Sequence, residues 1–426
     1  MANYLFYISL AFIWIMLLYH MFLAQGGYRH FKTFEKVIPK WEQKMNEMDL
    51  PTVNVFIPAH NEEVVIKQTL TAMSRLYYPK DKLEVILIAD NCSDRTKEIG
   101  EEFAAQFPFI RVVETVGEYK GRGKSSALNF ALKESKGEII VVYDADNTPE
   151  RKAVWNLVMG LVNDEGAAAV VGKFRVINAA STWLTKFINI ETITFQWLAQ
   201  AGRYFWFKIA TIPGTNFAIR RSILDQLNGW DTSALTEDTE LTIRIYNLGY
   251  YIRFFPAAVT WEQEPETFKV WWRQRTRWAR GNQYVVLKFL KNLLRLNSRK
   301  MMFDLFYFFF TYFIFFFGVI LSNAIFVVNL FHELDLQIGS VALVLWGMAT
   351  LLFLTEIMIA LSIEKNQLTA GNIFYTLLMY FTYSQMWIVL VINALFLELK
   401  RIIRKEESVW YKTERFSVNK KEEKTV

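Results

Sequence analysis

The alternation of apolar and polar residues divides this 426-residue chain into long apolar runs near both ends and a central region of shorter segments. Residues 4–24 form a run of about one bilayer thickness, interrupted only by His20. Three more apolar runs cover residues 303–331, 338–363 and 373–397. We expect these runs to be helices embedded in a membrane, and the residues from roughly 40 to 300 to form a soluble cytoplasmic domain.

The residues that flank the first apolar run predict its orientation. Four basic residues follow the run: Arg29, His30, Lys32 and Lys36. Because basic flanks favour the cytoplasm, we expect the N-terminus outside the cell. No basic stretch precedes the run and no small-x-small pattern follows it, which indicates a retained anchor rather than a cleaved signal peptide. Residues 37–50, which include Pro39, are interpreted as a linker.

Short apolar segments in the central region alternate with helical patterns. Strands are predicted at residues 52–58, 83–89 and 139–142, and a further strand begins at Val112. A helical pattern of apolar residues separates the first two strands. This alternation predicts an α/β domain with a doubly wound, mostly parallel sheet that binds its ligands at the carboxyl ends of the strands.

Polar residues follow three of these strands. They are His60, Asn61 and Glu62 after the first strand, Asp90 after the second, and Asp144 and Asp146 after the last. Two carboxylates one residue apart can hold a hard divalent cation through oxygen ligands, or they can form an ordinary Asx turn. If this edge binds a nucleotide, we expect the base and ribose near His60 and Asp90, and the diphosphate near the metal.

A glycine-rich basic segment covers residues 117–125 and includes Lys120. It does not match a Walker phosphate loop, because Glu118 stands where the first glycine is required. Its glycines, its basic side chains and a predicted helix start near Ser125 still suggest an anion site. The alternative is a mobile basic loop.

Two later segments carry further candidate chemistry. Residues 236–240 open a predicted helix with Thr236 as its cap, so that Glu237 and Asp238 lie in the first turn, where acids also pair favourably with the helix dipole. Further on, a second predicted helix has Gln274, Arg277 and Trp278 at positions i, i+3 and i+4. This spacing brings an amide, a guanidinium and an aromatic ring onto one helix face.

In this order and at this spacing, four motifs resemble the D, DxD, TED and QxxRW series of processive family 2 glycosyltransferases. The motifs are Asp90, Asp144-x-Asp146, Thr236-Glu237-Asp238 and Gln274-x-x-Arg277-Trp278. The family includes cellulose synthases, poly-N-acetylglucosamine synthases and nodulation chitin-oligosaccharide synthases. The resemblance covers about residues 50 to 285. It implies a GT-A fold, a UDP-sugar donor and a growing polysaccharide as the acceptor.

The resemblance also implies roles for individual residues. Asp238, with Glu237 beside it, would be the catalytic base, and Asp144 and Asp146 would hold Mg²⁺ or Mn²⁺ at the diphosphate. The acceptor would meet Gln274, Arg277 and Trp278, with Asn216 on a strand-like segment close by. The nucleotide sugar would contact His60, Asn61, Glu62, Asp90, Lys120, Asp144, Arg275 and Arg277.

The chain departs from the family pattern at one motif. The usual Asp-Asp-Gly-Ser run after the second strand is Ala89-Asp90-Asn91-Cys92 here, so we expect Asn91 to make the turn that glycine normally makes. Hyaluronan synthases carry a different sequence where Thr236-Glu237-Asp238 stands, which disfavours that activity. The residues fit inverting transfer, in which a cation neutralises the leaving diphosphate and a base takes the proton of the acceptor hydroxyl.

Composition and charge bear on the disulfide content and on the binding partners of the protein. The formal net charge is +6, and the single cysteine, Cys92, excludes an intramolecular disulfide. Residues 267–300 contain ten Lys and Arg and no acid. An apolar stripe within them predicts an interfacial helix that contacts anionic membrane lipids, the alternative being a surface helix of the soluble domain. The stripe comprises Val286, Phe289, Leu290, Leu293 and Leu294. No nucleic-acid partner is expected, because this stretch adjoins membrane segments.

The basic tail raises a question of topology. Residues 400–426 hold nine Lys and Arg against five Glu, which favours the cytoplasm. A cytoplasmic tail requires the run at 373–397 to be bent or re-entrant, and its hydrophobicity falls at residues 382–385. The nodulation synthases, with three simple crossings, are the precedent against this. The tail resembles the loop that closes over UDP in cellulose synthases, which implies that Lys412 or Arg415 approaches the diphosphate.

The predicted organisation has five parts: an anchor and flank (1–36), a cytoplasmic glycosyltransferase domain (37–265), the QxxRW and interfacial helices (266–302), membrane helices (303–399) and a basic tail (400–426). The leading hypothesis is a multi-pass enzyme of the plasma membrane that polymerises a hexose or N-acetylhexosamine and extrudes the product, with or without an accessory subunit. One alternative adds one or a few sugars to a lipid. A transporter or nucleotide sensor is disfavoured, since the apolar runs carry few ionisable residues besides Glu356.

Overall fold

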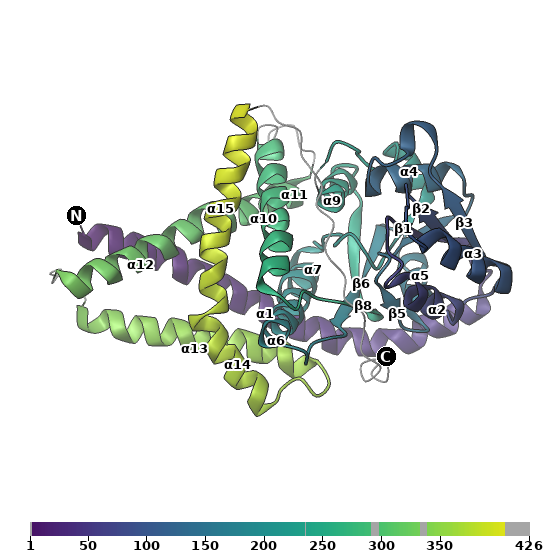
Figure 1. Cartoon of the computed structure of the whole chain (residues 1–426). Coiled ribbons are helices and arrows are strands. Elements are labelled where there is room, and N and C mark those ends of the chain that lie inside the picture. Colours follow the sequence, from purple (N-terminus) through teal and green to yellow (C-terminus); the bar gives the residue numbers. More distant parts are fainter. Residues whose placement is uncertain (1, 235, 291–297, 333–338, 405–426) are drawn as a thin grey trace. The chain divides into compact units, whose positions relative to one another are not determined.

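The computed structural model describes residues 2–234, 236–290, 298–332 and 339–404. These residues divide into two compact units (Figure 1). The sheet unit comprises residues 33–185 and 207–270, and the helical unit comprises 2–32, 186–206 and the described residues from 271 to 404. Residues 186–206, although enclosed by the sheet unit in the sequence, therefore belong with the helices.

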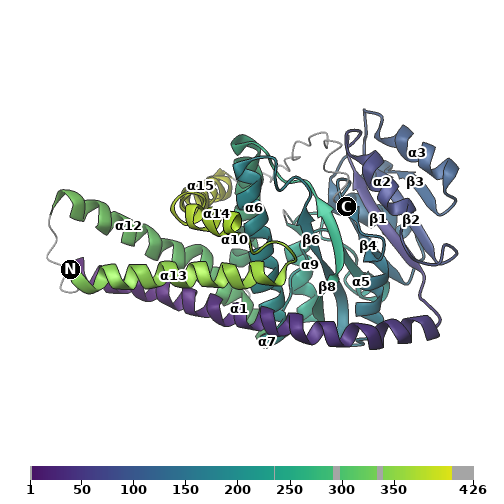
Figure 2. The same cartoon turned by 90° about the horizontal axis from the view of Figure 1, so that it is seen from below.

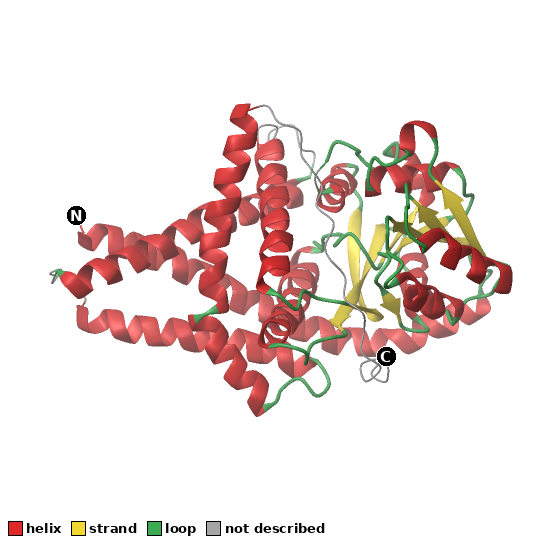
Figure 3. Ribbon diagram, in the orientation of Figure 1, coloured by secondary structure: helices red, strands yellow, loops and turns green. Residues whose placement is uncertain are grey.

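The sheet unit contains one mixed sheet, drawn in yellow in Figure 3. Its described strands are β1 (Val53–Ala59), β2 (Leu83–Ala89), β3 (Ile110–Glu114), β4 (Ile139–Val142), β5 (Thr148–Pro149), β6 (Ala167–Val176), β7 (Phe217–Arg220) and β8 (Tyr251–Glu262). They are arranged in the order β3-β2-β1-β4-β7-β6-β8-β5. The first four are parallel, and β7 runs antiparallel to both β4 and β6. The predicted doubly wound, mostly parallel sheet is confirmed, and the carboxyl ends of β1, β2 and β4 meet at one edge.

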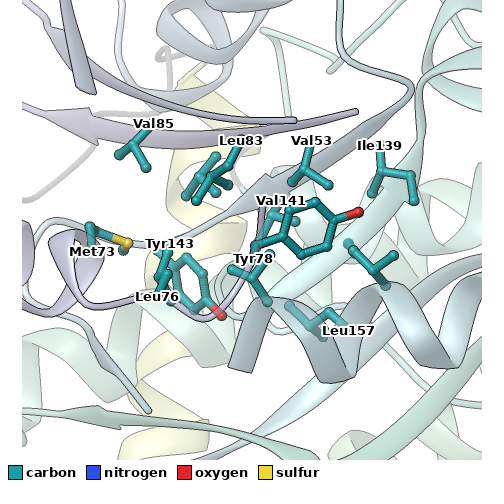
Figure 4. Close-up of a cluster of buried hydrophobic side chains, with 14 of the residues drawn as sticks. Val53, Met73, Leu76, Tyr78, Leu83, Val85, Ile139, Val141, Tyr143 and Leu157 are labelled. Atoms are coloured by element: carbon teal, nitrogen blue, oxygen red, sulfur yellow. The ribbon is translucent and has the colours of Figure 1, made fainter. Parts of the chain in front are cut away.

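Helices cover the sheet, and a large apolar cluster lies against it. The helices of this unit are α2 (Ile66–Ser74), α3 (Thr96–Gln106), the short η1 (Gly117–Tyr119), α4 (Lys124–Lys133), α5 (Ala153–Val162), α8 (Arg221–Gln226) and α9 (Glu237–Asn247). Figure 4 shows Val53, Val85 and Val141 of three neighbouring strands in this cluster, with Leu157 of α5 and Met73 of α2. All are fully buried or nearly so, and each contributes about 1.5–3 kcal/mol of hydrophobic stabilisation. This core fixes the strand ends that carry the polar residues.

The predicted linker at residues 37–50 is wrong, because helix α1 runs without interruption from Ala2 to Glu47. Pro39 lies inside the helix, where it removes a hydrogen-bond donor. The helix continues because Phe34, Ile38, Trp41 and Met45 repeat at helical spacing and pack on the core of the sheet unit. Trp41 stacks on Phe255 of β8, with ring centroids 5.8 Å apart.

The helical unit is built from long apolar helices. It contains the first part of α1, most of α6 (Trp183–Thr194), the π-helical η2 (Phe195–Gly202), most of α7 (Arg203–Phe207) and most of α10 (Phe268–Leu290). It also contains α11 (Arg299–Phe309), the π-helical η4 (Phe310–Phe315), α12 (Phe316–Phe331), α13 (Gly339–Ile363), α14 (Ala370–Phe381) and α15 (Tyr383–Arg404). Within the described residues, four helical stretches are long and apolar enough to cross a membrane: Asn3–Glu47, Arg299–Asn329, Val344–Ile363 and Tyr383–Arg401.

Small residues bring α1 and η2 close together. A Cβ atom on Gly27 would lie 2.0 Å from the carbonyl oxygen of Trp197, and one on Gly202 would lie 2.3 Å from that of Leu23. Close approach through glycines is typical of helix pairs in membranes. The same unit places α1 beside α13 (Figure 2), where His20 Nδ1 lies 3.9 Å from a carboxylate oxygen of Glu356.

The predicted interruption of the last apolar run is confirmed. Helix α14 ends at Phe381 and α15 begins at Tyr383, so the two helices are separated by Thr382. Helix α15 lies beside α10 (Figure 1), and Gln283 Nε2 donates to the carbonyl oxygen of Val391. Of the predicted interfacial stripe, Val286 is buried on α10, while Leu293 and Leu294 lie outside the described residues.

Candidate active site

The carboxylate of Asp90 is the centre of the polar edge formed by β1 and β2. Its Oδ1 atom accepts hydrogen bonds from the Thr115 hydroxyl at 2.6 Å and from the Gly121 N–H at 2.7 Å. His60 Nδ1 lies 2.7 Å from the carbonyl oxygen of Asp90. A carbonyl oxygen only accepts, so Nδ1 carries the proton in this contact. The structure thus brings together His60 and Asp90, as the sequence predicted.

Two asparagines make the turns that follow β1 and β2. Asn61 and Asn91 have φ angles of +55° and +50°, in the left-handed region that asparagine tolerates better than most residues. The expectation that Asn91 replaces the usual glycine is confirmed. The side-chain oxygen of Asn61 accepts a hydrogen bond from the Ser93 N–H at 2.7 Å, and Glu62 is buried behind it with its own N–H donating to Thr96.

The glycine-rich segment contacts this edge through its backbone. Gly117, Gly121 and Gly123 all have positive φ angles, so the chain turns sharply before α4 begins at Lys124. Since Gly121 donates to Asp90, the segment is anchored at the nucleotide side of the predicted site. Lys120 is exposed beside it.

An ionic cluster of the sheet unit is organised by Lys124, which is not among the site residues predicted from the sequence. Its ammonium donates to Asp144 Oδ1 at 2.6 Å and to the carbonyl oxygen of Gly214 at 2.7 Å, and it lies 3.6 Å from Glu237 Oε1. Burial by itself would lower the pKa of Lys124, but the negative charges of Asp144, Glu237 and Asp238 outweigh burial and raise that pKa above its ordinary value. Lys124 is therefore a fixed cation among three acids.

The position of Lys124 in the sequence could have identified it as a candidate site residue. It is the first residue of a helix that directly follows a glycine-rich turn, the position from which a side chain can reach a strand end.

Asp238 and Glu237 lie at the start of α9, as predicted. Asp238 Oδ1 accepts a hydrogen bond from the Thr239 N–H at 2.7 Å, while its other oxygen faces Gly214, where an added Cβ would lie 3.0 Å away. Gly214 has a φ angle of +87°. Thr236 precedes the helix, but its side chain makes no capping hydrogen bond. The helix start is thus correct and the predicted capping contact is wrong.

The residues at the end of β4 suit a divalent cation. Asp144 and Asp146 are both partly exposed, and the backbone of Asp144 is fixed by a 3.0 Å hydrogen bond from its N–H to the Thr215 hydroxyl. No cluster of three or more His, Cys, Asp or Glu suited to a metal occurs among the described residues. Two carboxylates leave several coordination positions for diphosphate oxygens, which fits a cation that arrives with its nucleotide.

Asn216, expected near the acceptor, is completely buried. Its Nδ2 atom donates to the carbonyl oxygens of Lys173 and Ala258, both at 2.9 Å. These bonds join β6 and β8 at the irregularity in their pairing, between Val171 and Lys173. The amide of Asn216 therefore joins two strands, and its expected place near the acceptor stays a prediction.

The QxxRW residues lie on α10 in the helical unit. Gln274 and Arg275 are buried, whereas Trp278 is 38% exposed. The Arg275 guanidinium lies 4.0 Å from the centre of the Trp278 ring, and its Nη1 donates to Gln274 Oε1 at 2.7 Å. Arg275 is only 1% exposed, and its expected contact with the nucleotide stays a prediction. Lys412 and Arg415 lie outside the described residues.

Comparison with solved structures supports the fold. A mannosyltransferase from Pyrobaculum calidifontis, solved with GDP-mannose and Mn²⁺, aligns with a TM-score of 0.54 and 20% identity, over 85% of this chain and 99% of that protein. The sheet unit has the GT-A-like fold that the motifs implied.

Sequence comparisons identify several relatives of this chain. A probable glycosyltransferase of Bacillus subtilis, YdaM, is 67% identical over 420 residues, covering 99% of this chain and all of that protein. A β-monoglucosyldiacylglycerol synthase of Trichormus variabilis is 33% identical over 62% of this chain and 56% of that protein. A poly-β-1,6-N-acetyl-D-glucosamine synthase of Staphylococcus epidermidis is 30% identical over 58% of each. The chain thus spans little more than half of the last two proteins.

The family itself follows from a match that covers more than half of the chain. Residues 51–281 match the family described as "Glycosyltransferase like family 2", a range that begins just before β1 and ends on α10, after Trp278. The chain belongs to glycosyltransferase family 2.

Proposed function

We propose that this protein is a membrane-embedded, inverting glycosyltransferase that polymerises a β-linked polysaccharide from a UDP-sugar and extrudes it across the plasma membrane. The observation that carries the catalytic part is the cluster of Asp144, Lys124 and Asp238 beside the strand ends. The family assignment supports transfer chemistry, and the long apolar helices support a multi-pass membrane protein. The basic residues after the first apolar run are the reason to place the sheet unit in the cytoplasm.

In this proposal the donor nucleotide binds along the edge of β1 and β2. Asp90 meets the uracil or ribose, since its carboxylate is fixed by Thr115 and Gly121 and needs no rearrangement to accept from a ligand. His60, Asn61 and Glu62 line the same edge, and exposed Lys120 reaches toward the phosphates. Arg277 and the tail residues Lys412 and Arg415 complete the binding of the diphosphate.

Asp144 and Asp146 would hold Mg²⁺ or Mn²⁺ at the diphosphate. When bound, the cation neutralises the charge that develops on the leaving UDP. Lys124 adds a permanent positive charge at the same place, because its pKa is raised. Its hydrogen bond to Asp144 holds the ammonium beside that carboxylate before the donor arrives.

Asp238 acts as the general base and takes the proton from the acceptor hydroxyl. Its position at the start of α9 and the contact of one oxygen with the Thr239 N–H leave the other oxygen facing Gly214. Gln274, Arg277 and Trp278 bind the acceptor end, where the exposed ring of Trp278 can stack on a sugar face.

A second candidate is transfer of one or a few sugars to a lipid such as diacylglycerol. The similarity to β-monoglucosyldiacylglycerol synthase favours it, and it requires the same catalytic residues without extrusion.

The size of the product distinguishes polysaccharide synthesis from transfer to a lipid. Membranes containing the protein are incubated with a panel of radiolabelled UDP-sugars and with GDP-mannose, and UDP or GDP release is measured together with the product. Labelled material that is retained on dialysis, stays in the aqueous phase and is digested by a β-glycosidase supports the polymerase. Label that enters chloroform and migrates as a glycolipid supports the second candidate. Membranes with Asp238→Asn serve as the control.

A further inference from the structure

The carboxylate of Glu191 joins three helices of the helical unit. Glu191 lies on α6, in the segment 186–206 that the sequence places between β6 and β7. Its Oε2 accepts from Arg275 Nη2 of α10 at 3.0 Å and from the Tyr383 hydroxyl of α15 at 2.9 Å. Its Oε1 accepts from the indole N–H of Trp387 at 2.9 Å. One acidic side chain therefore links α6, α10 and α15.

The partners of Glu191 are held firmly in their places. Arg275 and Tyr383 are each 1% exposed, and Trp271 is fully buried. The Trp271 indole donates to the Tyr383 hydroxyl at 2.9 Å, which in turn donates to Glu191. A buried guanidinium needs a negative charge beside it, and Glu191 supplies one at ion-pair distance.

Arg275 connects Glu191 to two of the QxxRW residues, Gln274 and Trp278. Its guanidinium faces the ring of Trp278 at 4.0 Å and donates to the side-chain oxygen of Gln274 at 2.7 Å. The Nη2 atom of the same guanidinium donates to Glu191 Oε2. The orientation of Gln274 and Trp278 therefore depends on the carboxylate of Glu191, which is 83 residues away from Gln274 in the sequence.

We infer that Glu191 is a positioning residue for the acceptor end of the reaction. It acts through Arg275, which fixes the amide of Gln274 and the exposed ring of Trp278. Tyr383 and Trp387 extend the same network to α15 directly after the interruption at Thr382, so the start of that helix is tied to the acceptor residues. This inference rests on the acceptor role proposed above for Gln274 and Trp278.

The test compares three variants of the full-length membrane protein. Glu191→Gln removes the charge, Glu191→Asp keeps the charge with a shorter reach, and Tyr383→Phe removes one hydrogen bond without leaving an unpaired charge. Glu364→Gln is the matched control, because Glu364 also accepts an indole N–H, from Trp197 at 2.9 Å, within the same unit. For each variant, transfer to acceptor, donor hydrolysis and the donor KM are measured, and folding is checked by a single peak in detergent chromatography.

We expect Glu191→Gln to lower transfer by about tenfold to a hundredfold, as misplacement of a binding group does. Donor hydrolysis and donor KM should stay within about twofold of the original protein. Glu191→Asp should recover part of the loss, and Tyr383→Phe should show a smaller loss of the same kind. Glu364→Gln should change the ratio of transfer to hydrolysis little.

Several results would overturn the inference. Equal loss of transfer and hydrolysis in folded Tyr383→Phe or Glu191→Gln would mean that the network supports the fold alone. An unchanged ratio in Glu191→Gln would remove Glu191 from the acceptor site. If the original protein glycosylates a lipid and makes no polymer, the proposed polymerase fails, but the ratio of transfer to hydrolysis still tests Glu191 with that lipid as the acceptor.

Discussion

Lys124 donates a 2.6 Å hydrogen bond to Asp144, so the first acid of the DxD motif is paired with an ammonium of the protein itself. The bond joins the start of α4 to the end of β4. A cation that binds at Asp144 must share this carboxylate with Lys124 or displace it, and the two positive charges oppose each other at short range.

Lys124→Met should therefore separate metal binding from catalysis. Without the ammonium, Asp144 and Glu237 lose a neighbouring positive charge, and we expect Mn²⁺ to bind on the order of tenfold more tightly when no nucleotide is present. Glycosyl transfer should fall at the same time, because a fixed charge at the leaving diphosphate is lost. Isothermal titration with Mn²⁺ and UDP-release assays measure the two effects, with Lys133→Met on the exposed end of α4 as control. Weaker Mn²⁺ binding would show that Lys124 organises the carboxylates and does not compete with the metal.

Asp238→Asn should abolish transfer while UDP still binds. The asparagine keeps the size of the side chain and its contact with Thr239, but it cannot accept a proton, so a loss of at least about 10²-fold is expected. The rate is measured as UDP release in the presence of acceptor, and UDP affinity by titration. Activity above a few per cent of the original would remove Asp238 from the role of base.

Asp146→Asn should weaken UDP binding only when metal is present. Replacing one carboxylate ligand removes a negative charge from a hard cation, whereas the contacts of the nucleotide with Asp90 do not depend on it. UDP affinity is compared in Mn²⁺ and in EDTA. Asp90→Asn is the matched variant and should weaken binding in both conditions; an Mn²⁺-dependent affinity left intact by Asp146→Asn contradicts the metal role.

Gly27→Ala should destabilise the helical unit. A methyl group at this position would lie 2.0 Å from the carbonyl oxygen of Trp197, so α1 and η2 must move apart, at a cost of about 1–3 kcal/mol. Gly347→Ala on α13 is the control, because no atom lies within 4 Å of the added Cβ. Thermal unfolding in detergent measures both. A melting temperature that falls equally in the two variants would count against the close contact.

We expect the basic tail (400–426) to lie in the cytoplasm. Lys412 or Arg415 can approach the diphosphate only if the tail is on that side of the membrane. The chain has one native cysteine, so Ser417→Cys in a Cys92→Ser background gives a single labelling site. A membrane-impermeant thiol reagent should label it only after the cells are permeabilised. Labelling of intact cells would place the tail outside and would establish a simple crossing by the last apolar run.

The parts of the structure that follow from local patterns were predictable from the sequence. Strand β2 matches its predicted range of residues 83–89, Asn91 makes the expected turn, and the last apolar run is interrupted where its hydrophobicity falls. In each case the residues that decide the structure are neighbours in the chain.

The errors arose where distant residues decide the structure. Pro39 suggested a linker, but the packing of Trp41 and Met45 on the core maintains the helix. The sequence also did not predict that the amide of Asn216 joins β6 to β8. The link from Glu191 to Arg275 is invisible in the sequence, because only tertiary structure brings α6 and α10 together.

Gly214 limits how the acidic cluster can be redesigned. It contributes a carbonyl oxygen to Lys124 and no side chain, and any other residue would need to adopt a φ angle of +87° with its Cβ 3.0 Å from an Asp238 oxygen. Substitution here would disturb the base and the lysine together. Attempts to change the sugar or the acceptor by directed evolution should therefore leave this loop untouched and vary the side chains on α10.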